Sequence, residues 1–144
     1  RRHRAGPAVG AAAAPACAAR RGVILADTSV WTGHLRQRDP VLATLLAEGA
    51  VLGHAFVTGE IACGALRNRV AVLEALAGLP QSAMACDAEV LGFIEAAGLA
   101  GGGIGYVDAH LLAATRLTPD ARIWTLDRRL AMAAARLGLG GAAP

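Results

Sequence analysis

The sequence contains no lysine, and all 14 of its basic residues are arginine. This absence excludes Schiff-base chemistry, a phosphate-binding P-loop with its essential lysine, and a Ser–Lys nucleophile pair. Aromatic residues make up only 3% of the chain, which argues against a platform of stacked rings for single-stranded nucleic acid. A run of about 18 strongly apolar residues, the length that spans a membrane, is also absent, so we expect no membrane segment.

Cysteine is scarce, with Cys17, Cys63 and Cys86 as the three examples. Their number is odd, they lie far apart and no Cys-x-x-Cys pair occurs, so the sequence supports neither a disulfide framework nor a zinc site. We therefore expect buried, reduced thiols in a cytoplasmic protein.

The formal net charge of +3 belongs to the start of the chain. Residues 1–22 hold 5 of the 14 arginines and no acid, which leaves 9 basic against 11 acidic residues, a balance of −2, in residues 23–144. If the folded part binds nucleic acid, it does so through local patches or bound cations. We expect residues 1–22 to be an Arg/Ala-rich leader, disordered or a misassigned start, and residues 23–144 to form one domain.

From residue 23 onward, strand-like and helix-like segments alternate. Short apolar runs predict strands within residues 23–26, 50–56, 82–86 and 122–126. Helical periodicity and capping signals predict a short helix after residue 28 and further helices at 40–49, 57–68, 70–79, 88–99, 106–117 and 127–139. This alternation predicts an α/β fold with a mostly parallel central sheet.

Two acids follow the first and the last predicted strand. Asp27 comes directly after the run VILA, and Asp127 comes directly after RIWTL. Ligands of parallel sheets bind at the carboxyl ends of the strands, so both carboxylates would open into one crevice if these strands are neighbours. Either acid could instead be a helix N-cap. For the first helix, Thr28 or Ser29 could provide the cap and leave Asp27 free.

Two further acids lie on predicted helices in unusual surroundings. Glu60 has mostly small, uncharged residues on its stripe, including Gly64 in the predicted helix interior, although it could pair with Arg67 or Arg69. Asp108 lies in the first turn of its helix, where it could serve the helix dipole. Four carboxylates that converge without a lysine would repel one another unless a cation bound. Oxygen ligands of this kind suit Mg²⁺ or Mn²⁺.

Four motifs together resemble one known family. DTSVW follows the first strand, GE lies on a helix, GYVDAHLLA opens a later helix and TLD follows the last strand. Over residues 23 to about 139 this order resembles PIN domains and, more narrowly, the VapC-type toxins of bacterial toxin–antitoxin pairs. The resemblance implies a three-layer α/β/α domain and a metal-dependent endoribonuclease. It also implies an RNA substrate, a cognate antitoxin and a homodimer.

The resemblance carries the family's acidic quartet over to Asp27, Glu60, Asp108 and Asp127, which would hold Mg²⁺ or Mn²⁺. Its flanking hydroxyl residues correspond to Thr28 or Ser29 and to Thr125. Arginines near the crevice would contact RNA phosphates, with Arg67 the best candidate, followed by Arg36 and Arg128.

Other side chains are expected to have structural roles. His34 and His54 fit surface or structural positions, the helix directs His110 away from Asp108, and Trp31 fits the core better than the site. Two alternatives remain open: a metal-dependent DNA nuclease relative and a catalytically inactive PIN-like binding module. A phosphatase of the haloacid dehalogenase type is disfavoured, because it needs an aspartate where Ser29 stands and a later lysine.

Overall fold

Three parallel strands lie at the centre of the computed structural model, which describes residues 22–141; residues 1–21 of the expected leader lie outside this range. The strands are β1 (Val23–Ala26), β2 (Val51–Leu52) and β3 (Ala121–Trp124), in the order β2-β1-β3. Ala26 pairs with Trp124 at the carboxyl ends of β1 and β3. The two strands therefore end level with each other, as parallel neighbours, and the residues after them start from the same edge of the sheet.

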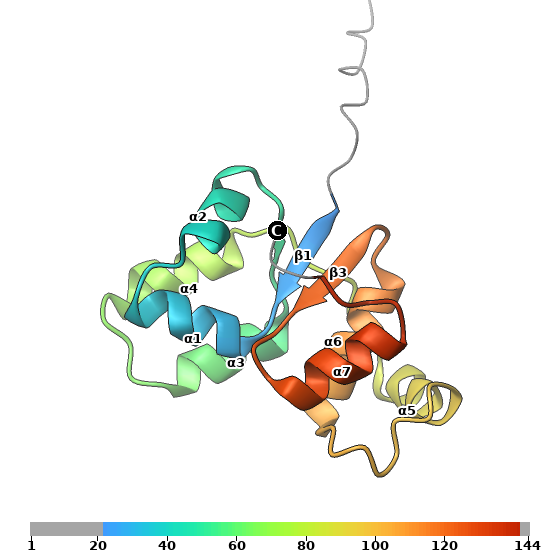
Figure 1. The fold of residues 1–144 in the computed structure, drawn as a ribbon. Helices are drawn as coiled ribbons and strands as arrows, with labels where there is room; N and C mark the ends of the chain where they lie inside the picture. The colour runs from blue at the N-terminus through green and yellow to red at the C-terminus, as the bar shows by residue number, and fades with distance from the viewer. Residues whose placement is uncertain (1–21, 142–144) are drawn as a thin grey trace, which may run out of the picture.

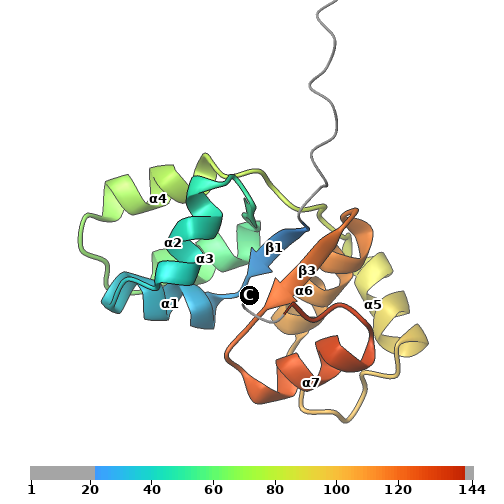
Figure 2. The ribbon, with the colours of Figure 1, turned by 45° about the horizontal axis from the view of Figure 1, so that its top comes forward.

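Helices cover the sheet on both sides. They are α1 (Thr28–Arg36), α2 (Pro40–Ala47), α3 (Ala55–Cys63), α4 (Arg69–Ala77), α5 (Asp87–Ala96), α6 (Tyr106–Leu117) and α7 (Arg128–Arg136). Helices α1 to α4 gather on one side of the strands and α5 to α7 on the other (Figures 1 and 2). The expected three-layer α/β/α fold is confirmed. Within residues 22–141, none of these helices has both the length and the apolar character needed to cross a membrane.

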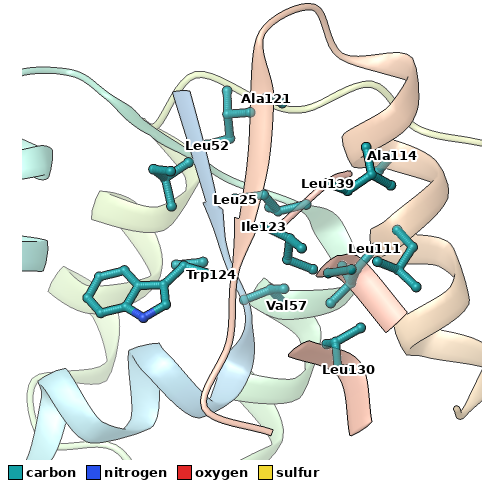
Figure 3. Packing of buried hydrophobic residues seen from close by; sticks show 14 of the residues in the cluster. Leu25, Leu52, Val57, Leu111, Ala114, Ala121, Ile123, Trp124, Leu130 and Leu139 are labelled. Carbon is teal, nitrogen blue, oxygen red and sulfur yellow. The ribbon is translucent and has the colours of Figure 1, made fainter. Parts of the chain in front are cut away.

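The core forms on both faces of the sheet because side chains alternate along each strand. On β3, Ile123 points toward Leu111 of α6, whereas Trp124 points to the opposite side (Figure 3). Helix α6 is buried from Ala109 to Thr115. Its alanines allow the neighbouring elements to approach closely, and each fully buried leucine adds about 1.5–3 kcal/mol of hydrophobic stabilisation.

One predicted strand is wrong, and so are both ends of one predicted helix. Residues 82–86 form no strand; this part of the chain makes one isolated parallel bridge, between Gln81 and Gly53. The backbone N–H of Ala83 instead donates to Thr118 Oγ1 at 2.9 Å. Helix α3 ends at Cys63, and Gly64 is its C-cap, with extended backbone. The predicted helix over 57–68 therefore starts too late and runs too far, and Gly64 is not in a helix interior.

The cysteines and the start of α5 also differ from expectation. Cys63 and Cys86 are free, as expected, but both are exposed, so the prediction of buried thiols is wrong for them; Cys17 lies outside the described residues. Cys86 is the N-cap of α5, and its backbone N–H donates to Glu89 Oε2 at 2.8 Å. The side chain of Asp87, at the first helical position, is thereby left to contact α6.

Candidate active site

Asp27 is held at the carboxyl end of β1 by a set of short hydrogen bonds. Its side chain is only 6% exposed. Ser29 Oγ donates to Asp27 Oδ1 and Thr125 Oγ1 donates to Asp27 Oδ2, both at 2.5 Å. The backbone N–H of Val30 donates to Oδ1 at 3.2 Å. A buried carboxylate with three donors is fully oriented, and two of the donors are the predicted supporting hydroxyls.

The cap of α1 is Asp27 itself, so the prediction that Thr28 or Ser29 provides the cap is wrong. Thr28 and Ser29 are the first two residues of the helix. The carboxylate therefore combines two roles that the sequence alone presented as alternatives, since Oδ1 caps the helix while both oxygens stay at the edge of the sheet. Ser29 Oγ also accepts from the Leu126 backbone N–H at 2.9 Å, which ties α1 to the loop after β3.

Asp127 reaches the same edge from the end of β3. It is the N-cap of α7, and the backbone N–H of Leu130 donates to its Oδ1 at 2.9 Å. Its own backbone N–H donates to Thr125 Oγ1 at 3.0 Å. Thr125 thus accepts from the backbone of one acid and donates to the carboxylate of the other, so that a single hydroxyl joins Asp127 to Asp27.

Glu60 comes from α3 and is exposed. Thr28 Oγ1 donates to Glu60 Oε2 at 2.5 Å, which links α3 to the first residue of α1. Arg69 donates to the backbone carbonyls of Ala62 and Gly64 at the end of α3. The arginine therefore satisfies the open end of the helix, and the partner of Glu60 is a hydroxyl.

Asp108, in the first turn of α6, shows that the quartet converges. Burial is the main cause that raises the pKa of Asp108 above its ordinary value. The negative charges of the other three quartet carboxylates raise it further, Asp127 most, then Asp27 and Glu60. A hydrogen bond from the Gly105 backbone opposes these effects. The four acids thus lie within electrostatic range, although they come from four separate parts of the chain.

The quartet offers only oxygen donors, a set that suits a hard divalent cation such as Mg²⁺ or Mn²⁺. In the described part of the chain, no group of three or more His, Cys, Asp or Glu side chains is already arranged to hold a metal ion. The four acids are therefore close enough to affect the pKa of Asp108, but the described residues hold no preformed metal cluster.

A groove of about 650 Å³ opens beside Glu60, between α1 and the end of α3. Arg36 and Arg67 both line it, together with Thr28. Arg67 reaches the groove from the connection between α3 and α4, because α3 ends before it. Arg128 is the first residue of α7, next to Asp127, and is not among the residues that line this groove.

The remaining candidates have structural surroundings. Trp31 is 6% exposed and belongs to the core, as expected. His34 Nδ1 accepts from the backbone N–H of Asp39 at 3.0 Å. His54 is buried and is the N-cap of α3. His110 is buried against Asp87, a contact that sequence reasoning missed, because nothing in the local pattern places residue 87 beside α6.

A parallel α/β domain with acids gathered at the carboxyl edge of its sheet has the features of the PIN-domain class. Two proteins named Ribonuclease VapC32, from Mycobacterium tuberculosis strains CDC 1551 / Oshkosh and ATCC 25618 / H37Rv, are each 42% identical to this chain over 117 residues. The alignment covers 81% of this chain and 94% of each relative. No protein-family profile matches the chain. The chain belongs to the VapC family of PIN-domain ribonuclease toxins.

Proposed function

We propose that this protein is an endoribonuclease that hydrolyses RNA phosphodiester bonds at the acidic quartet with Mg²⁺ or Mn²⁺. The observation that carries the proposal is the joining of Asp27 and Asp127 at one edge of the sheet through Thr125 Oγ1. The raised pKa of Asp108, to which the other three quartet carboxylates each contribute, supports it. Carboxylates gathered at this density are costly in a folded protein unless a cation offsets their repulsion. Membership in a ribonuclease family supports RNA as the substrate.

The proposed roles follow from how each acid is held. A bound divalent cation supplies Lewis acidity, which activates water and offsets the negative charge that develops on the phosphate. Asp27 provides a rigid ligand, because Ser29 and Thr125 fix both of its oxygens. Glu60 and Asp108 approach from α3 and α6. Asp127 keeps one oxygen on the backbone of α7 and has Oδ2 to offer.

RNA would approach through its phosphates. Arg36 and Arg67 line the groove next to Glu60. The phosphates of an RNA strand in this groove would therefore meet positive charge close to the acids. Arg128 would contact the strand on the Asp127 side. These contacts carry no base information, so specificity would depend on the shape of the RNA and on other contacts.

The test is cleavage of structured RNA by the purified full chain with Mg²⁺ or Mn²⁺, compared with Asp108→Asn. Asp108 is the best residue to change because, unlike Asp27 and Asp127, it caps no helix. We expect a loss of about a hundredfold or more, the scale seen when one electrostatic catalytic group is removed. Asp120→Asn is the matched control, because Asp120 is exposed in a turn with a φ of 60°, a conformation that asparagine tolerates.

Four results would contradict the proposal. Equal cleavage by Asp108→Asn and the unaltered chain would contradict the metal-dependent mechanism. Cleavage that persists in a chelator would contradict it as well. Metal-dependent cleavage of DNA but not of RNA would favour the DNA nuclease alternative. Absence of cleavage of both nucleic acids would favour the binding module.

We further propose a cytoplasmic homodimer that is inhibited by a cognate antitoxin, which family membership supports. Light scattering of the purified chain should give twice the 14.5 kDa of one chain; a mass of 14.5 kDa would contradict the dimer. The antitoxin should suppress RNA cleavage when added to the protein.

We also propose that residues 23–144 hold the nuclease domain. Deletion of residues 1–21 should therefore leave stability and cleavage unchanged.

A further inference from the structure

The groove beside Glu60 has an apolar wall, which contacts with phosphates alone leave unexplained. Leu35 of α1 lines the groove and is 39% exposed. Leu66, from the connection between α3 and α4, also lines the groove and is partly buried against the core. Ile61 of α3 belongs to the core and lines the groove as well. We call Leu35, Ile61 and Leu66 the apolar wall. Such a surface favours a ligand that has an apolar face of its own.

Hydrogen bonds fix the elements that form this groove. Thr28 Oγ1 donates to Glu60 Oε2 at 2.5 Å and joins α1 to α3. Arg69, the first residue of α4, donates to the backbone carbonyls of Ala62 and Gly64 at the end of α3. These bonds hold both ends of the short connection that carries Leu66. The apolar wall is therefore formed before a ligand binds, and binding does not have to order it.

The same groove offers free positive charge next to a proposed metal ligand. Arg36 and Arg67 both line it, and neither side chain has a hydrogen bond or ion pair within residues 22–141. Glu60, one of the four acids, lines the groove too. A ligand that fits here has anionic groups for the arginines, an apolar face for the wall and a reacting group near Glu60. A nucleotide of an RNA strand has all three.

The occupant that fits best is an unpaired nucleotide. The groove volume of about 650 Å³ lies within the roughly 300–1,000 Å³ typical of pockets that enclose small organic ligands. A base in an RNA duplex is stacked and paired, whereas a base in a loop or at an end is free to leave the stack. Among the described residues, no aromatic ring lines the groove, so the base packs on aliphatic side chains. An apolar peptide would leave both arginines without an anion.

We propose that the apolar wall takes one unpaired nucleobase beside the phosphate that is cleaved, while Arg36 and Arg67 hold the phosphates that flank this base. The inference rests on the proposed function, because it needs RNA in the groove. It adds a contact that depends on a base, which phosphate contacts do not provide. Leu35, as the exposed member of the wall, is then a residue that determines specificity.

The experiment removes one base at a time from the RNA. The probe is the structured RNA that the unaltered chain cleaves, together with copies in which a single nucleotide lacks its base. Binding is measured with the cleavage-deficient Asp108→Asn chain. We expect the loss of one unpaired base to weaken binding roughly tenfold, at the low end of what one stacked base contributes. Equal affinity for all copies would overturn the inference.

Leu35→Ala, added to the same background, tests whether the wall is where the base binds. The effect of the missing base should shrink to less than about threefold, because the base and the leucine side chain act as a coupled pair. Leu35→Met keeps an apolar surface and should restore most of the effect. Leu91→Ala is the matched control, since Leu91 is an exposed leucine of α5 that does not line the groove. A full tenfold effect in Leu35→Ala would overturn the inference.

Arg67→Gln separates the phosphate contacts from the base contact. It should weaken the binding of every copy of the RNA by the same factor, because a phosphate contact carries no base information. The copy that lacks the critical base should therefore still bind about tenfold more weakly than the intact RNA. Loss of that difference in Arg67→Gln would contradict the separate roles proposed for the arginine and the wall.

Two further outcomes distinguish this inference from the proposals on which it builds. If Leu35→Ala halves the mass found by light scattering and leaves the effect of the missing base in place, the wall is an interface between copies of this chain. That result would overturn the inference while the proposed nuclease stands. Absence of RNA cleavage by the unaltered chain would overturn the proposed function and this inference with it.

Discussion

Thr125 Oγ1 donates to Asp27 Oδ2 at 2.5 Å, although the two residues are 98 positions apart in the chain. The contact exists because β1 and β3 are parallel neighbours whose last residues, Ala26 and Trp124, pair with each other. The next residues on both strands therefore leave the sheet side by side. A sheet edge built in this way brings an acid and a hydroxyl together without local sequence proximity.

Thr125→Val should lower both stability and activity. The change leaves Asp27 Oδ2 without its donor in a buried setting, which costs about 1–3 kcal/mol of unfolding free energy. It also frees the carboxylate to rotate, so we expect RNA cleavage to fall about tenfold, at the lower end of the effect of losing one preorganised group. Urea unfolding and initial cleavage rates measure the two effects. Thr44→Val is the control, because Thr44 is exposed on α2 and its hydroxyl donates to the Pro40 carbonyl. Equal losses in both variants would count against a specific role for Thr125.

Asp108→Asn should stabilise the metal-free protein at neutral pH while it abolishes cleavage. The folded-state pKa of Asp108 is raised above its ordinary 3.8, so the folded protein binds this proton more tightly than the unfolded chain does. Ionised Asp108 therefore lowers stability above pH 3.8, and the loss disappears as the pH falls and the carboxyl is protonated. The gain from asparagine should accordingly be largest near pH 7 and shrink toward pH 4.

Thermal unfolding in a chelator across that pH range checks the prediction for Asp108. Asp120→Asn should change stability little at any pH. A destabilised Asp108→Asn variant at pH 7 would show that this carboxylate is not strained by its neighbours.

Mild acid should destabilise the fold through His54. The pKa of His54 is lowered from 6.5 to about 4 by burial and by His110. Between these pH values, His54 is protonated in the unfolded chain but neutral in the folded protein. Stability is fully present above pH 6.5 and falls as the pH drops toward 4, by about 3 kcal/mol at most. His54→Asn should remove this part of the pH dependence, as seen by urea unfolding between pH 4 and 7. His34→Asn, at a partly exposed ring, should leave it in place.

Arg36 and Arg67 should act on RNA through charge. In the cleavage-deficient Asp108→Asn background, replacement of either arginine by glutamine should weaken RNA binding. It should also reduce the slope of log affinity against log salt by about 0.7 per lost phosphate contact with a single strand. Arg136→Gln provides the control, because Arg136 lies at the end of α7 and does not line this groove. An unchanged salt slope in Arg36→Gln and Arg67→Gln would place the RNA elsewhere.

Much of the fold was predictable because its elements carry local signals. The apolar run before Asp27 predicts β1, and Asp39 before Pro40 predicts the start of α2, where Asp39 Oδ1 accepts from two backbone N–H groups. The segment 82–86 was not predictable in this way. Periodicity alone does not distinguish a short strand from a buried connection in a short apolar run. Here the backbone N–H of Ala83 donates to Thr118, 35 residues away, instead of to a neighbouring strand.

The sequence singles out four acids that the structure brings within electrostatic range of one another, but it predicts their hydrogen bonds less well. The positions of Asp27 and Asp127 after strands indicate a shared edge, but the sequence treated capping and ligation as alternatives. In the structure both acids cap helices and still lie at that edge. The start of α3 was missed because His54, an uncommon cap residue, provides the acceptor through its ring. Contacts such as Asp87 with His110 depend on how α5 packs on α6, which no local pattern records.

Calorimetric titration of Mn²⁺ into the full chain at pH 7 tests the central claim most directly. If Asp27, Glu60, Asp108 and Asp127 form one metal site, the unaltered chain and Asp120→Asn should bind Mn²⁺ with the same affinity. Asp108→Asn should then bind at least about tenfold more weakly, as expected when a hard oxygen ligand is lost. Equal Mn²⁺ affinity of Asp108→Asn and the unaltered chain would contradict the account.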